Sequence, residues 1–69
     1  MEYLVILEKA EHNWAAYSPD VPGCIATGGT PEETLQEYQG ALRMHLTGLA
    51  EDGLPIPQPT AKAQYVKVS

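Results

Sequence analysis

The chain has 69 residues, with four Lys plus Arg against nine Asp plus Glu, which gives a formal net charge of -5. A hydrophobic content of 43% is too high for a disordered tail, so we expect residues 1–69 to form one small domain. A domain of this size buries only roughly 60% of its unfolded surface, which predicts that self-association adds to its stability. The acidic balance disfavours direct binding to nucleic acid, because such binding depends on Lys and Arg contacting phosphates.

Cysteine count and hydropathy narrow the class of protein further. The single Cys24 excludes an internal disulfide, and one thiol with two His is too few for a four-ligand zinc site. No apolar run reaches the roughly 20 residues of a membrane span, and the first residues lack the features of a signal peptide. We therefore expect a cytoplasmic protein without membrane attachment, metal or cofactor.

The first half of the chain has the pattern of three short strands. Residues Tyr3–Leu7 are apolar at odd and even positions, which is typical of a strand covered on both faces. A polar break and then Asn13–Tyr17 predict a hairpin with this strand. Pro22 and Gly23 suit the centre of a type II turn, after which Cys24–Thr27 can form a third strand.

A single long helix is predicted for the second half. Thr30 suits the N-cap, Pro31 the first turn, and Glu33 the reciprocal position of a capping box. Gly53 suits a left-handed C-cap, so the helix should run from Pro31 to about Asp52. Its core-facing stripe, at a spacing of 100° per residue, is expected to be Leu35, Tyr38, Leu42, Leu46 and Leu49.

Beyond the helix, the prolines of residues 54–59 predict an extended connector, and Ala63–Val68 is predicted to be a last strand. The expected fold class is therefore α+β, an antiparallel sheet in β-β-β-α-β order with one helix packed on one face. Because one helix covers only one face, the other face should expose apolar side chains. We expect a homodimer or higher homo-oligomer to cover them.

Three blocks of the chain resemble the HicB-like antitoxin family when taken in their order and spacing. They are the turn Ser18-Pro19-Asp20-Val21-Pro22-Gly23-Cys24, the cap Gly28-Gly29-Thr30-Pro31-Glu32-Glu33 followed by Leu35, and the tail Gly53-Leu54-Pro55-Ile56-Pro57-Gln58-Pro59. Each block alone is weakly specific. Their ordered combination is fairly specific and covers nearly all of the chain.

The resemblance implies a degenerate ribonuclease H-like fold and a non-enzymatic function. The implied partner is a small basic mRNA interferase toxin, HicA, whose RNA-binding surface and catalytic His an acidic antitoxin would cover. Longer members of the family add a DNA-binding domain, for which residues 1–69 leave no room. The alternative that stays open is a solitary homo-oligomeric protein with a ligand-binding or structural role and no toxin.

Candidate partner-binding residues fall in two groups. In the first half of the chain, Asp20 could present a carboxylate and Trp14 could anchor a partner, although local turn chemistry and a buried sheet position are the favoured alternatives. Cys24 is expected to be a small buried apolar residue, because no neighbouring base would activate its thiol. A residual nuclease with Asp20 at its centre is disfavoured, since two-metal catalysis needs several converging carboxylates.

The second group lies on the helix. Gly40, Met44 and Gly48 form a stripe opposite the Leu stripe, beside Glu33 and Glu37. A mid-helix Gly costs about 0.8–1 kcal/mol relative to Ala, which calls for a reason. The functional interpretation is close approach by another chain, with the acids attracting a basic partner. The alternative is drift in a helix face that carries no function.

Overall fold

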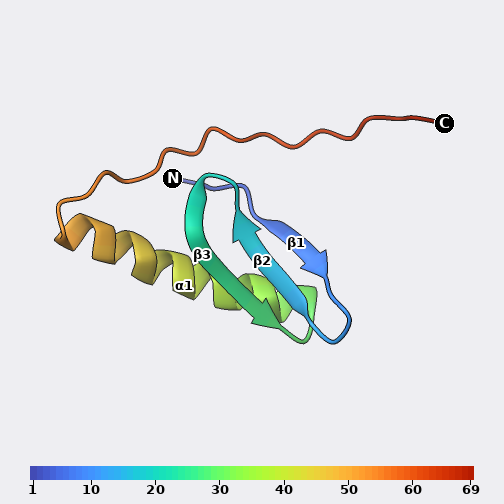
Figure 1. Ribbon diagram of the computed structural model, residues 1–69, viewed down its shortest axis with the longest axis horizontal. Coiled ribbons are helices and arrows are strands. Elements are labelled where there is room, and N and C mark those ends of the chain that lie inside the picture. The colour runs from blue at the N-terminus through green and yellow to red at the C-terminus, as the bar shows by residue number, and fades with distance from the viewer.

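The computed structural model describes residues 1–69. Three strands, β1 (Ile6–Lys9), β2 (Trp14–Ser18) and β3 (Val21–Gly28), precede one helix, α1 (Pro31–Glu51). The strands form an antiparallel sheet in the order β1-β2-β3, and α1 crosses one face of it (Figure 1). The α+β class, the antiparallel sheet and the single helix are as the sequence predicts.

The two faces of the sheet differ in how well they are covered. Residues opposite one another in neighbouring strands point to the same face, so the register assigns each side chain to a face. The face turned toward α1 carries Leu7, Ala16 and Ala26, whereas the open face carries Ile6, Tyr17 and Ile25. β1 is thus apolar on both faces at Ile6 and Leu7, and α1 covers only the Leu7 face. The strand that the sequence predicts over Tyr3–Leu7 is observed over Ile6–Lys9, so its predicted bounds are wrong, because pairing with β2 begins only at Ile6.

Strand β3 begins earlier than the sequence predicts. The pair Ser18↔Val21 leaves only two residues for the turn, and the next pair is Tyr17↔Ile25. Residues 22–24 therefore bulge out of the ladder, and Gly23 supports the bulge with a φ of 83°. The Pro-Gly pair forms an irregularity within the strand instead of the turn before it.

Both ends of α1 follow from local chemistry. The Thr30 side chain accepts a hydrogen bond from the Glu33 N–H at 3.1 Å, which is one half of the predicted capping box. At the other end Gly53 adopts a φ of 69°, and the Leu54 N–H donates to the Leu49 carbonyl at 2.9 Å. This is a Schellman cap, so the helix starts and stops where predicted.

The core-facing stripe of α1 differs from the prediction. Thr34 and Tyr38 are its buried residues, while Leu35 is 45% exposed. Leu42 packs against the core from a half-buried position, and Leu46 and Leu49 are half-buried. The small residues Ala16, Val21 and Cys24 form the sheet side of the core, and the Tyr38 ring fills the space above them. Apolar periodicity thus identified Tyr38 and Leu42 correctly, but it placed Leu35 in the core and missed Thr34. A small buried Thr takes the place of a Leu where the helix approaches the sheet closely.

Gly28 marks the closest approach between β3 and α1. A Cβ at this position would lie 2.6 Å from the Thr34 Oγ1 and 3.0 Å from the Thr34 backbone nitrogen. Thr34 is fully buried and its hydroxyl donates to the Thr30 carbonyl, so it has little freedom to move away.

We therefore expect Gly28→Ala to lower the free energy of unfolding by about 1–3 kcal/mol, the typical effect of overpacking. Urea denaturation measures this loss. Gly29→Ala is the matched control, because its Cβ would meet only the Glu33 carboxylate at 3.9 Å. Equal stability of the two variants would contradict the close approach.

The predicted strand over residues 63–68 is not observed, and the element order is β-β-β-α. The segment after α1 runs back over the sheet past the N-terminus and then projects beyond the body of the protein (Figure 1). An extended segment becomes a strand only when a neighbour accepts its hydrogen bonds, and this one has no neighbour within the chain. The composition of the segment is typical of a strand, but the segment does not lie beside another strand.

Candidate functional site

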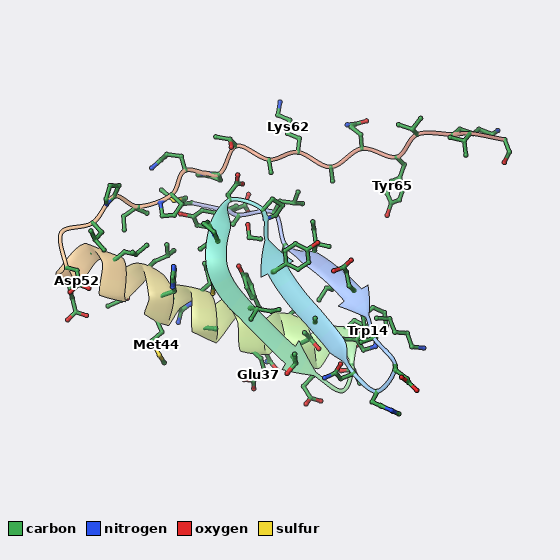
Figure 2. The ribbon with its side chains drawn as sticks, in the orientation of Figure 1. Trp14, Glu37, Met44, Asp52, Lys62 and Tyr65 are labelled. Atoms are coloured by element: carbon green, nitrogen blue, oxygen red, sulfur yellow. The ribbon has the colours of Figure 1, made fainter.

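Three of the predicted partner-binding residues lie together on the outer side of α1. Glu37, Gly40 and Met44 line one shallow hollow, together with Gln36 and Ala41. Figure 2 shows Glu37 and Met44 pointing away from the sheet. The helical spacing therefore identified a continuous surface.

A second hollow adjoins the first at the edge of β3. Its lining consists of Gly23, Cys24, Ile25, Ala41, Met44 and His45, so the two hollows share Ala41 and Met44. Ile25 is 63% exposed and Met44 is 76% exposed. We call the two hollows together the α1–β3 groove. It combines exposed apolar side chains with the Glu37 carboxylate.

Ile25 is the groove residue that the sequence analysis missed. Strand alternation contained the signal, because a buried Cys24 places its neighbour on the opposite face of the sheet. That face had been expected to be covered as a whole, so no single residue on it was singled out.

The two helix glycines have no packing role within the chain. A Cβ at Gly40 or at Gly48 would meet no atom within 4 Å. Gly40→Ala and Gly48→Ala are therefore each expected to raise the free energy of unfolding by about 0.8–1 kcal/mol, which denaturation measures. If a partner approaches closely here, both variants also weaken its binding. A stability gain with unchanged assembly and partner affinity would make these glycines neutral.

The remaining candidates on the sheet and helix lie elsewhere. Trp14 is half-buried at the end of β2 that lies away from Met44 (Figure 2). Glu33 is exposed in the first turn of α1, and Gly48 is half-buried one turn beyond Met44. Their roles as partner contacts stay predictions.

Asp20 holds the segment that follows the helix. Its carboxylate accepts hydrogen bonds from the Thr60 N–H at 3.1 Å, the Thr60 hydroxyl at 3.0 Å and the Ala61 N–H at 3.1 Å. Nearby, the Tyr3 hydroxyl donates to the Pro57 carbonyl at 2.6 Å. The prediction that the Asp20 side chain caps its own turn is therefore wrong: the carboxylate accepts only from Thr60 and Ala61, across 40 positions of the chain. Sequence spacing gives no signal for such a contact.

We expect Asp20→Ala to release residues 60–69 and to lower the free energy of unfolding by about 1–2 kcal/mol. The hydrogen bonds that are lost had the charged Asp20 carboxylate as their acceptor, which makes each of them stronger than a bond between neutral groups. Because Asp20 is only half-buried, water replaces part of what is lost. Amide hydrogen exchange at Thr60 and Ala61 should accelerate. Thr60→Val is the matched control, because it removes only the hydroxyl donor. Unchanged exchange at Ala61 in Asp20→Ala would contradict the clamp.

The buried polar groups lie beneath the groove. Cys24 is a free, buried thiol, as predicted. The Tyr38 hydroxyl is buried without a hydrogen-bond partner. Burial raises the pKa of Tyr38 to about 12, and the neighbouring Cys24 contributes in the same direction. Tyr38 belongs to the core, and Cys24 borders the groove but is only 7% exposed.

Two further findings concern metals and membranes. No group of three or more His, Cys, Asp or Glu side chains converges in an arrangement that could hold a metal ion. The helix α1 lacks the apolar length that crossing a bilayer requires.

Comparison with known proteins identifies the family. Residues 3–69 match the family described as HicB_like antitoxin of bacterial toxin-antitoxin system. Antitoxin HicB 2 of Photorhabdus laumondii is 38% identical over 69 residues, which cover 99% of this chain and 50% of that protein. An uncharacterised 14.9 kDa protein of Haemophilus phage HP1 is 32% identical over 66 residues, again 50% of its length. The chain thus spans about half the length of these two relatives.

A relative of similar length and a solved structure complete the comparison. A UPF0150 protein of Thermoplasma acidophilum is 32% identical over 63 residues, which cover 90% of this chain and 91% of that protein. A chain of the HicA3 and HicB3 toxin-antitoxin complex matches the fold with a TM-score of 0.69 at 24% identity, over 86% of this chain and 72% of that one. The match over almost every residue of the sheet, the helix and the following segment shows that this chain belongs to the HicB-like antitoxin family.

Proposed function

We propose that this chain is a non-enzymatic antitoxin module that binds a small basic ribonuclease toxin of the HicA type and inhibits it by occlusion. The family match over residues 3–69 carries the proposal. The fold likeness to a chain of the HicA3 and HicB3 complex is consistent with it. Inhibition by covering a surface needs no catalytic group in the antitoxin.

The α1–β3 groove is the surface that we assign to the toxin. Met44 supplies an exposed apolar contact in the groove, and Met is adaptable in shape. Ile25 borders the groove at the edge of β3 and exposes its side chain on the adjoining open face of the sheet. Gly40 lets another backbone approach the helix closely, because it adds no side chain beside Met44. Glu37 adds negative charge at the groove, and the net charge of -5 attracts a basic partner and speeds encounter.

The test is co-expression with a small basic protein encoded in a neighbouring reading frame. We expect the toxin alone to arrest growth, co-expression to restore it, and the two purified proteins to form a complex that no longer cleaves mRNA. An unrelated acidic protein of similar charge is the control for non-specific attraction. Arrest that persists despite soluble expression of this chain would refute the proposal.

A second candidate function is a solitary homo-oligomer with a ligand-binding or structural role. The exposed apolar side chains Ile25, Val66 and Val68 favour it, because further copies of the chain could cover them. Under this alternative no neighbouring frame encodes a basic partner, and purification yields the chain alone. Gene context and co-purification together therefore separate the two functions.

A further inference from the structure

Residues 62–69 form an arm that makes no hydrogen bond with the rest of the chain. Tyr65, Val66 and Val68 are almost fully exposed on it. Figure 2 shows Lys62 and Tyr65 standing free of the sheet and helix. β-branched and aromatic residues that alternate in an extended segment are typical of a strand. The arm thus has the composition of a strand and lacks a neighbouring strand.

The base of the arm is fixed, which gives the arm a direction. The Asp20 carboxylate holds Thr60 and Ala61, and the Tyr3 hydroxyl holds Pro57. From these anchors the arm leads away from the body of its own chain (Figure 1). At roughly 3.3 Å per residue it extends about 26 Å, which is enough to span the four-residue strand β1 of a neighbouring molecule. Its direction favours a strand edge in another molecule.

The sheet offers two free edges of unequal quality. In the order β1-β2-β3, the outer edges of β1 and β3 have no neighbour. The β3 edge is interrupted by Pro22, which has no N–H to donate, and by the bulge that follows it. The β1 edge has neither Pro nor bulge. The β1 edge is therefore regular over its whole length, whereas the β3 edge is regular only over residues 25–28, after the bulge. The uninterrupted edge of β1 is the better template for an added strand.

Charge supports the same pairing. The arm carries Lys62 and Lys67 and no acid, whereas residues 1–61 carry two cations and nine acids. Glu2, Glu8 and Glu11 lie in or beside β1, against the single cation Lys9 at the end of the strand. An arm of positive charge is therefore attracted to the β1 edge of a chain that is otherwise strongly acidic.

We propose that two copies of this chain exchange their arms, residues 62–69 of each copy adding as a strand to the outer edge of β1 in the other. The exchange is reciprocal, so it closes as a two-fold dimer and leaves no unpaired arm. Val66 and Val68 extend one face of the partner's sheet, and Tyr65 extends the other. The dimer supplies the fourth strand that the isolated chain lacks. It leaves the α1–β3 groove open and does not depend on a toxin.

Sedimentation equilibrium of the full chain and of Val66→Pro and Lys67→Pro tests the proposal. Alternate N–H groups of a strand point to opposite sides, so one of two neighbouring prolines must remove a ladder donor. We expect a dimer for the full chain and a dissociation constant raised at least about tenfold in one or both Pro variants. Val66→Thr keeps the N–H and the branched side chain, and should dimerise like the full chain. Folding is not at risk, because the arm packs on nothing within its own chain.

Amide hydrogen exchange identifies which strand edge the arm contacts in the partner molecule. In the dimer, the arm and the outer amides of Ile6–Lys9 should gain protection as concentration rises, and the β3 edge should not. A monomeric full chain, unchanged dimerisation in both Pro variants, or protection at β3 instead of β1 would each overturn the proposal.

Discussion

Tyr38→Ala is expected to remove about a third or more of the protein's free energy of unfolding. Truncating a buried aromatic residue costs about 3–5 kcal/mol, and a chain of this length has only about 3–10 kcal/mol of stability in total. Tyr38 is the largest fully buried side chain, and its ring covers the small residues Ala16 and Cys24. Urea denaturation followed by Trp14 fluorescence measures the loss.

Tyr38→Phe is the matched control, because it keeps the ring and removes only the hydroxyl. That hydroxyl makes no hydrogen bond of ordinary geometry, although Cys24 and the Ser18 backbone lie close to it, so its removal should leave the stability at neutral pH unchanged or raise it by up to about 1 kcal/mol. A large destabilisation in Tyr38→Phe would show that the hydroxyl has a stabilising partner after all. Wild-type stability in Tyr38→Ala would show that the core does not depend on the ring.

The wild-type protein and Tyr38→Phe are also expected to differ in how their free energy of unfolding depends on pH. The folded pKa of about 12 lies above the unfolded value of 10.0, so the folded state keeps its proton longer. The stability from this group is therefore complete below pH 10 and is lost as pH rises toward 12, by about 2–3 kcal/mol at 1.36 kcal/mol per pH unit. Tyr38→Phe should lack this part of the alkaline loss. Parallel pH profiles for the two proteins would contradict the assignment.

Met44→Lys is expected to weaken toxin binding at least about 30-fold, the effect of removing an interface hot spot of about 2 kcal/mol. Met44 lies where the two hollows of the α1–β3 groove meet, and three quarters of its side chain are exposed. A charged side chain there removes the apolar contact and repels a basic partner. Calorimetric titration with the toxin measures the affinity.

Gln39→Lys is the control for charge. It adds the same charge to an exposed position of the same helix that does not line the groove. Its affinity should change less than about threefold, as expected for a charge at the rim of an interface. Equal weakening by both variants would mean that attraction comes from net charge alone. Unchanged affinity in Met44→Lys would show that the toxin binds to a surface other than the α1–β3 groove.

The helix and its ends could be predicted from the sequence because their signals act within a few residues. Thr30 caps an N–H three positions later, and Gly53 takes the left-handed conformation that its own lack of a side chain allows. The outer surface around Glu37 and Met44 also followed from helical spacing alone. The family could be predicted from three short blocks of residues that occur along this chain in the order typical of that family.

Contacts between distant positions could not be predicted in this way. The Asp20 clamp joins positions 40 residues apart, and the close approach of Gly28 to Thr34 depends on how the sheet meets the helix. The bulge that moves the start of β3 depends on pairing with β2, and the exposure of Leu35 depends on where the sheet lies beneath the helix.

By itself, the sequence determined which segments are helical or extended, where the helix begins and ends, and to which family the chain belongs. Only the tertiary structure decided which extended segments become strands, that Thr34 and not Leu35 is buried beside Tyr38, and that residues 62–69 stand free. The physical reason is the separation along the chain between the residues whose interactions form each feature. Caps and turns are fixed by hydrogen bonds between near neighbours, whereas a strand exists only when another strand, here or in another molecule, accepts its hydrogen bonds.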